Sequence, residues 1–100
     1  MANTISRILL VDDEPKFLHS IAERLKLLGF DTLKASGGLE ALTLAQQNRI
    51  DMAIVDLKMP DMDGLVTITK LKEIYPDLKS VLLTGHGSEK VKQATETLSA

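Results

Sequence analysis

Short apolar runs alternate along the chain with longer segments whose apolar residues recur every three or four positions. The first pattern predicts buried strands, and the second predicts helices that pack on them. We expect strands over residues 5–11, 30–35, 50–55 and 80–83, and helices over residues 15–28, 39–48, 65–74 and 88–98. Strands that alternate with helices in this order form a parallel sheet with right-handed crossovers. The pattern therefore predicts an α/β fold.

Local signals support the limits of several elements. Pro15 suits the first turn of a helix, and Gly29 ends that helix. Its apolar stripe consists of Phe17, Leu18, Ile21, Ala22, Leu25 and Leu28. Residues 50–55 are almost continuously apolar, which is typical of a strand covered on both faces, whereas residues 30–35 suit a sheet edge.

Acidic or hydroxylic residues directly follow three of the predicted strands. Asp12 and Asp13 follow the first, Asp56 follows the third, and Thr84 follows the fourth. Because the carboxyl ends of parallel strands form one rim of the sheet, where ligands bind, we expect these side chains to meet. Clustered carboxylates provide the hard oxygen ligands that Mg²⁺ prefers. A buried carboxylate beside bound Mg²⁺ can act as a nucleophile towards a phosphoryl group, and Asp56 is the strongest candidate.

Each of these residues also has a simpler structural interpretation. Asp12 and Asp13, with Glu14, can serve as acceptors at a helix N-terminus, where Glu14 would favour the helix dipole. Asp56 alone can accept hydrogen bonds from the following turn. Asp61 and Asp63 are interpreted as acceptors in a loop and at a helix cap. The combination of carboxylates at one rim favours the phosphoryl-transfer interpretation over these separate ones.

Three further residues lie near the predicted rim. Gly85 allows the backbone to approach a ligand closely, and Lys58 lies two positions beyond Asp56, where it can affect access to the site. His86 is interpreted first as a solvated loop residue, with a metal-ligand or acid–base role as the alternative.

Composition narrows the class of protein without identifying it. One hundred residues with a net charge of −2 suit one small globular domain without the basic surface that nucleic acid binding requires. The absence of cysteine excludes thiolate metal sites and a cysteine nucleophile. No apolar run has the length of a signal peptide or a membrane span, so we expect a cytoplasmic domain.

Three segments together resemble the receiver domain of two-component response regulators. They are ILLVDDEP, AIVDLKMPDMDG and VLLTG, in this order and spacing. The resemblance implies a flavodoxin-like, doubly wound parallel sheet in which the strands present here have the order 2-1-3-4. It implies that Asp56 is the phosphoacceptor and that Asp12, Asp13, Asp56 and the main-chain carbonyl of Lys58 hold Mg²⁺. Thr84 would be the switch hydroxyl beside Gly85, and Lys58 and His86 would tune the rate of dephosphorylation.

The resemblance also implies partners and a signalling role rather than that of an enzyme. The phosphodonor would be a histidine kinase or a phosphotransfer protein, and an output domain could follow Ala100. Residues 1–100 would form one receiver domain that ends before the fifth strand and fifth helix of the family. No lysine of this chain corresponds to the phosphate-binding lysine of that fifth strand.

Two physical consequences are expected from this ending. The fourth strand becomes an open apolar edge over residues 81–83, which favours self-association. The sheet face beside the first helix is expected to be bare.

A receiver-like interaction module with weak or no phosphorylation is the alternative function, and a phosphatase that forms an aspartyl phosphate is a third. Lys58 disfavours the phosphatase because it occupies the position where a second carboxylate is needed.

Overall fold

The computed structural model describes residues 7–85 and 88–99, which form one parallel sheet covered by helices on both faces. The strands are β1 (Arg7–Val11), β2 (Asp31–Ala35), β3 (Met52–Asp56) and β4 (Lys79–Leu83). The helices are α1 (Pro15–Leu27), α2 (Gly38–Gln47), α3 (Gly64–Ile74) and α4 (Ser88–Ser99). The strand order is β2-β1-β3-β4, and all three pairings are parallel, which confirms the predicted fold class and strand order.

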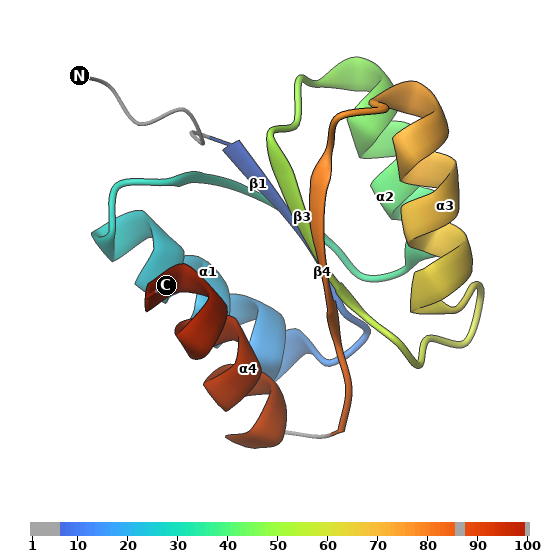
Figure 1. Ribbon diagram of the computed structural model, residues 1–100. Helices are drawn as coiled ribbons and strands as arrows, with labels where there is room; N and C mark the ends of the chain where they lie inside the picture. The colour runs from blue at the N-terminus through green and yellow to red at the C-terminus, as the bar shows by residue number, and fades with distance from the viewer. Residues whose placement is uncertain (1–6, 86–87, 100) are drawn as a thin grey trace.

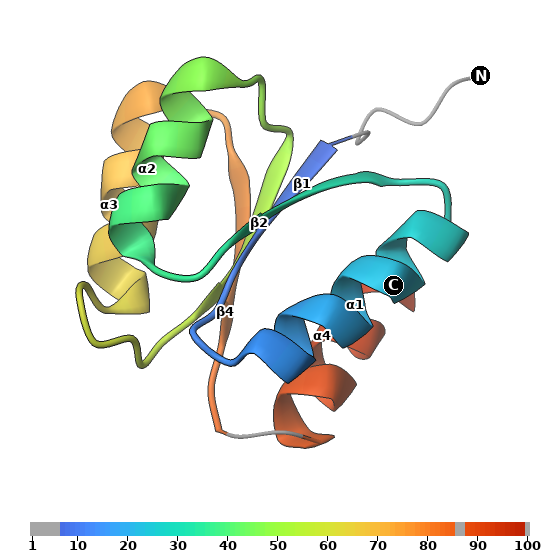
Figure 2. The same ribbon diagram turned by 180° about the vertical axis from the view of Figure 1, so that it is seen from behind.

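The helices divide into two pairs across the sheet. Helices α1 and α4 cover one face, and α2 and α3 cover the other (Figures 1 and 2). Both faces of the central strands β1 and β3 are therefore buried, which explains their continuous apolar sequences. None of the described helices is long and apolar enough to cross a membrane.

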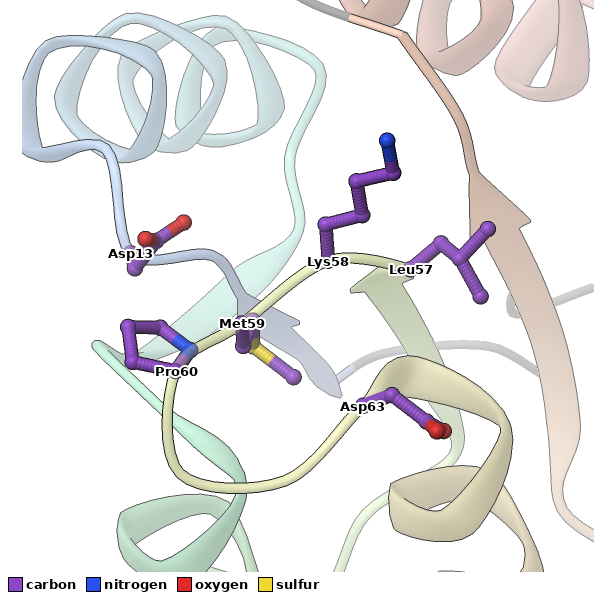
Figure 3. Close-up of a pocket in the computed structure, with 6 residues that line it drawn as sticks. All are labelled: Asp13, Leu57, Lys58, Met59, Pro60 and Asp63. Carbon is purple, nitrogen blue, oxygen red and sulfur yellow. The ribbon is translucent and has the colours of Figure 1, made fainter.

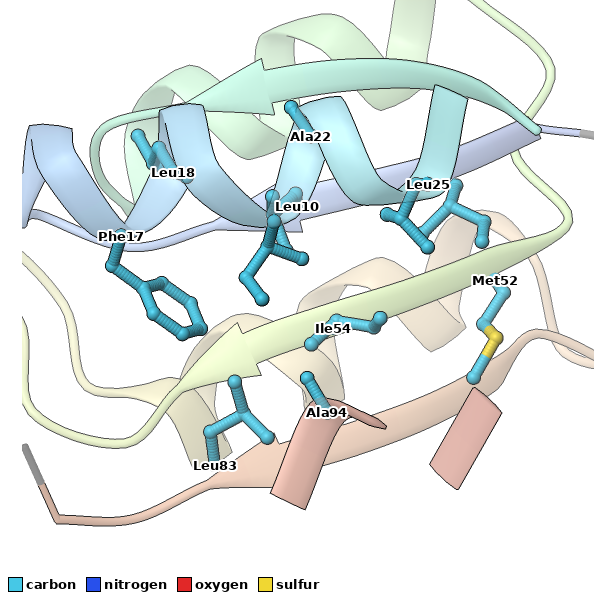
Figure 4. Close-up of a cluster of buried hydrophobic side chains, with 11 residues drawn as sticks. Leu10, Phe17, Leu18, Ala22, Leu25, Met52, Ile54, Leu83 and Ala94 are labelled. Atoms are coloured by element: carbon cyan, nitrogen blue, oxygen red, sulfur yellow. The ribbon is translucent and has the colours of Figure 1, made fainter. Parts of the chain in front are cut away.

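The core beneath α1 and α4 joins both helices to the central strands (Figure 4). Its fully or nearly fully buried members are Ile8, Leu10, Phe17, Leu18, Ile21, Ala22, Leu25, Met52, Ile54, Leu83 and Ala94. Burial of each large aliphatic side chain contributes about 1.5–3 kcal/mol to folding. Because Ala94 is 0% exposed and belongs to this cluster, α4 is part of the core rather than an appendage.

The expectation of a bare sheet face beside the first helix is wrong. Helix α4 occupies that face, next to α1 and β4 (Figure 1). The physical reason is that Val91 and Ala94 give α4 an apolar side, and this side packs on the cluster that α1 and the sheet share.

The predicted apolar stripe of the first helix also needs one correction. It runs through Leu25, as expected, but Leu28 is 58% exposed. Helix α1 ends at Leu27, and Leu28 forms its C-cap, from which the chain turns at Gly29 towards β2. Leu28 therefore lies beyond the part of the helix that packs on the sheet.

Strand limits decide where the rim of the sheet lies. β1 ends at Val11, so Asp12 and Asp13 follow it as predicted, whereas Asp56 is the last residue of β3 rather than the first after it. Val11 pairs with Val55, and Asp56 pairs with Leu83. The carboxyl ends of β1, β3 and β4 are thus level with one another.

Candidate functional site

Three carboxylates gather at the carboxyl ends of β1 and β3. One oxygen each of Asp12, Asp13 and Asp56 lies within 4.8 Å of the others. The pairing of β1 with β3 brings Asp56 beside the Asp12–Asp13 step, and both aspartates of that step reach the rim because β1 has already ended. The structure therefore brings together the acidic residues that the sequence placed at strand ends.

The three carboxylates differ in their exposure to solvent. Asp12 is 0% exposed and Asp56 is 4% exposed, whereas Asp13 faces solvent. Burial, which disfavours the charged form, raises the pKa of Asp12. Burial also raises the pKa of Asp56, and the charges of Asp12 and Asp13 act in the same direction. The site thus holds negative charge at an energetic cost, which a bound cation relieves.

Lys90 of α4 enters this cluster, and the sequence reasoning missed it. Its Nζ donates to Asp12 Oδ2 at 2.7 Å and to Glu14 Oε1, and lies 3.9 Å from Asp56 Oδ2. Burial lowers the pKa of Lys90, but the hydrogen bonds to Asp12 and Glu14 outweigh it, so the pKa is raised overall. Lys90 is only 1% exposed, and because its pKa is raised it remains a buried ammonium among carboxylates.

A pocket opens over the acidic cluster. It is lined by Asp13, Glu14, Asp56, Lys58, Gly85 and Lys90, so Lys58 and Gly85 lie where the sequence predicted. A second hollow adjoins it around Leu57, Met59, Pro60 and Asp63, with Asp13 and Lys58 shared (Figure 3). In Figure 3 the Lys58 side chain extends away from the loop that carries Met59 and Pro60.

Thr84 and Gly85 directly follow β4. Gln93 of α4 accepts from the Thr84 N–H at 3.0 Å, and its Nε2 donates to the Thr84 carbonyl at 2.8 Å and more weakly to the Thr84 hydroxyl at 3.4 Å. Thr84 itself does not line the pocket over the cluster. Gly85 has φ of +88°, which favours glycine. His86 lies outside the described residues.

The loop between β3 and α3 is fixed by two aspartates, as predicted. Asp63 is the N-cap of α3 and accepts from the Val66 N–H at 2.9 Å. Asp61 reaches across to the N-terminus of α2, where it accepts from the N–H groups of Gly38 and Leu39. These contacts hold the segment that carries Lys58 beside the cluster.

The donor set suits a hard divalent cation. The ligand atoms are carboxylate oxygens, and Mg²⁺ typically uses one or two protein carboxylates and retains several water molecules. The ammonium of Lys90 lies beside two of these carboxylates, which shows that the cluster attracts positive charge. The residues present therefore fit the predicted magnesium site.

Comparison with known proteins adds independent information. The family described as the response regulator receiver domain matches residues 8–100. The chain is 33% identical to the transcriptional regulatory protein GlrR of Escherichia coli, over 88% of this chain and 20% of GlrR. It is 30% identical to sporulation initiation phosphotransferase F of Bacillus subtilis, over 94% of this chain and 76% of that protein. The chain thus spans about a fifth of GlrR but most of the Bacillus protein.

Solved structures of similar fold include other receiver proteins. A response regulator receiver domain protein from Clostridium thermocellum has a TM-score of 0.77 and 33% identity, with 95% of this chain and 75% of that one covered. The response regulator TrrA from Thermotoga maritima, in complex with Mg²⁺ and BeF, has a TM-score of 0.76 and 30% identity, with 92% and 80% covered. Sequence motifs, strand order and family match agree: the chain belongs to the response regulator receiver domain family.

Proposed function

We propose that this receiver domain accepts a phosphoryl group on Asp56 from a histidine kinase or a phosphotransfer protein, with Mg²⁺ bound beside it. The observation that carries the proposal is the position of the Asp56 carboxylate. It lies at the end of a central strand, 4% exposed, with its oxygen within 4.8 Å of those of Asp12 and Asp13.

The metal site in this proposal consists of Asp12, Asp13, Asp56 and the main-chain carbonyl of Lys58. Bound Mg²⁺ offsets the negative charge of the incoming phosphoryl group. The described loop contacts of Asp61 and Asp63 keep the Lys58 backbone next to the carboxylates. The similar TrrA structure contains Mg²⁺ with BeF, and a similar protein from Burkholderia pseudomallei contains a phosphorylated aspartic acid and a calcium ion, which support a metal-assisted phosphoaspartate here.

The reaction requires Asp56 in its ionised form. An Asp56 oxygen forms a bond to phosphorus while the bond between phosphorus and the donor's imidazole nitrogen breaks, and that nitrogen retains the electron pair. Burial and the neighbouring carboxylates raise the pKa of Asp56, whereas the charge of Lys90 lowers it. A cation in the cluster therefore favours the nucleophilic form.

Four further residues are assigned to the response to phosphorylation and to the lifetime of the product. We assign Thr84 as the switch hydroxyl, with Gly85 allowing the backbone to approach the phosphoryl group. Lys58 and His86 are assigned to tuning the rate of dephosphorylation. GlrR and PrrA are named transcriptional regulatory proteins, and the chain covers 20% and 36% of their lengths. We therefore place the response in an output domain rather than in a direct contact of this domain with nucleic acid.

The phosphoacceptor assignment predicts the outcome of a direct labelling experiment. Incubation with MgCl₂ and acetyl phosphate should add one phosphoryl group, detected by intact-mass spectrometry, and Asp56→Asn should abolish the addition. Asp77→Asn provides the matched control, because Asp77 is exposed and lies at the opposite end of β4 from the site. This control should be labelled to the same extent as the original chain.

Other outcomes would support a different function or a different phosphoacceptor. Absence of any adduct, together with absence of Mg²⁺ binding, would favour a receiver-like interaction module. Sustained hydrolysis of a phosphate ester would favour a phosphatase. Equal labelling of the Asp56→Asn chain would place the phosphoryl group on another residue.

A further inference from the structure

The position of Lys90 raises a problem for any metal that binds at the acidic cluster. Its Nζ lies 2.7 Å from Asp12 Oδ2 and 3.9 Å from Asp56 Oδ2, which are two of the three carboxylates that would hold the metal. Mg²⁺ requires oxygen ligands at about 2.0–2.1 Å in octahedral geometry. The ammonium group therefore lies against two of the carboxylates that would hold the metal.

Repulsion prevents the two cations from sharing these oxygens. An ammonium and a divalent ion a few ångströms apart repel each other strongly in a site that is shielded from water. Lys90 is 1% exposed and Asp12 is 0% exposed, so solvent screens this repulsion poorly. A metal ion that gains Asp12 must displace the ammonium, or it must bind with fewer carboxylates.

Lys90 also attaches α4 to the rest of the molecule. Its Nζ lies 4.7 Å from the centre of the Phe17 ring of α1, in addition to its ion pairs with Asp12 and Glu14. One turn further along the same helix face, Ala94 packs in the core, and Gln93 holds Thr84. The first half of α4 is thus held by Lys90 at the acidic cluster, by Gln93 at the end of β4 and by Ala94 in the core.

We propose that Lys90 is a tethered competitor of the divalent cation: it occupies the carboxylates in the metal-free state, and metal binding releases it and loosens α4. The proposal rests on the metal site of the proposed function. In this proposal Lys90 lowers the affinity of the site for the metal, and α4 is the element that changes when the metal binds. Since coupling between sites is reciprocal, metal binding must weaken the Lys90 contacts by the same factor by which these contacts weaken metal binding.

The first test measures binding of Mg²⁺ alone by titration calorimetry. Lys90→Met retains an unbranched side chain without the charge, and it should bind Mg²⁺ at least about tenfold more tightly, within the usual range of coupling between sites. Lys92→Met is the matched control, because Lys92 is exposed on the same helix, and its affinity should stay close to that of the original chain. Equal or weaker binding by Lys90→Met, with its circular dichroism unchanged, would overturn the proposal.

The second test uses the original chain and therefore does not depend on the folding of a variant. Hydrogen–deuterium exchange with and without MgCl₂ should show faster exchange in peptides from α4 when the metal binds. Peptides from the second half of α2, on the opposite face of the sheet and away from the loop that carries Lys58, should be unaffected. Slower or unchanged exchange in α4 at saturating Mg²⁺ would overturn the proposal.

These tests separate the inference from the phosphoacceptor assignment. Tighter Mg²⁺ binding by Lys90→Met, with no phosphoryl adduct on any variant, would support the competitor and reject phosphorylation of Asp56. A labelled Asp56, with Mg²⁺ affinity unaffected by Lys90→Met, would support the proposed function and reject the competitor.

Discussion

At the scale of single residues, Asp61 shows how a carboxylate outside the acidic cluster supports it. Asp61 Oδ2 accepts from the Leu39 N–H at 3.0 Å, and Asp61 Oδ1 accepts from the Gly38 N–H at 3.2 Å. Helix α2 has no side-chain cap of its own, so Asp61 takes this role from another loop. The same contact holds the loop that carries Lys58, and this links helix capping to the geometry of the site.

This contact predicts a stability difference that depends on pH. The Leu39 and Gly38 N–H groups hold the pKa of Asp61 below its ordinary value of 3.8. A depressed pKa contributes stability that is fully present above pH 3.8 and is lost as the pH falls through the lower, folded-state pKa. Asp61→Ala should lower the melting temperature by about 5 °C at neutral pH, as is usual for loss of a cap in a small domain.

The pH dependence separates charge from packing at this position. The difference in melting temperature between Asp61→Ala and the original chain should shrink at acidic pH, once Asp61 is protonated in both the folded and the unfolded state. Asp77→Ala, which removes an exposed carboxylate, is the control and should melt like the original chain. Calorimetry of the three chains from neutral to acidic pH checks the prediction, and a difference that grows on acidification would contradict it.

At the scale of elements, the start of α3 is packed directly against the phosphoacceptor strand. The Gly64 N–H donates to the Leu57 carbonyl at 2.7 Å, immediately beyond β3. A Cβ at this position would collide with the Asp56 carbonyl oxygen and lie 2.9 Å from Leu57 Cα. Both are backbone atoms, which cannot move aside as a side chain can. Helix α3 and the Asp56 backbone therefore depend on glycine at this contact.

Gly64→Ala should destabilise the domain and disturb the site together. Alanine favours a helix by about 1 kcal/mol over glycine, but overpacking costs about 1–3 kcal/mol, and here the crowded atoms are backbone. We therefore expect a net loss of stability in urea unfolding and weaker Mg²⁺ binding. Leu65→Ala is the control, because Leu65 is 57% exposed on the next position of the helix. Greater stability of Gly64→Ala would contradict the packing argument.

At the scale of the whole molecule, β4 forms one edge of the four-stranded sheet. Leu83 O accepts from the Leu57 N–H, so its backbone groups face the sheet, and those of Ser80 and Leu82 face the edge. Val81 and Leu82 are only partly buried. An edge strand with apolar side chains and outward backbone groups is a template for pairing with a second chain.

Self-association through this edge remains a prediction, and one substitution tests it. Ser80→Pro removes an outward N–H from the edge while leaving the Leu83 contact intact, so the fold should persist. It should weaken association by about tenfold, which corresponds to one or two backbone hydrogen bonds at about 1 kcal/mol each. Sedimentation equilibrium over a range of concentrations measures the effect, with Ser80→Ala as the control. A chain that stays monomeric at every concentration would contradict the prediction.

The sequence determined the α/β class and the three carboxylates from local information, whereas the strand order followed from the resemblance to the receiver family. Periodicity separates strands from helices, and residues at strand ends must lie at one rim of a parallel sheet. Asp12, Asp13 and Asp56 were found in this way, as was the capping role of Asp63. Local sequence also placed Gly85 at the pocket, where its backbone has positive φ.

Only the tertiary structure decided which side chains from other elements contact these residues. Whether α4 covers one face of the sheet or the other depends on where Val91 and Ala94 find apolar partners, and no local pattern specifies that choice. Once α4 packs beside α1, Lys90 is brought to Asp12, from which it is separated by 78 positions in the chain. A lysine on a helix usually has its charge in water, so its sequence context contains no signal of burial. The acidic residues of the site could thus be predicted from the sequence, whereas the position of Lys90 among them is a consequence of helix packing.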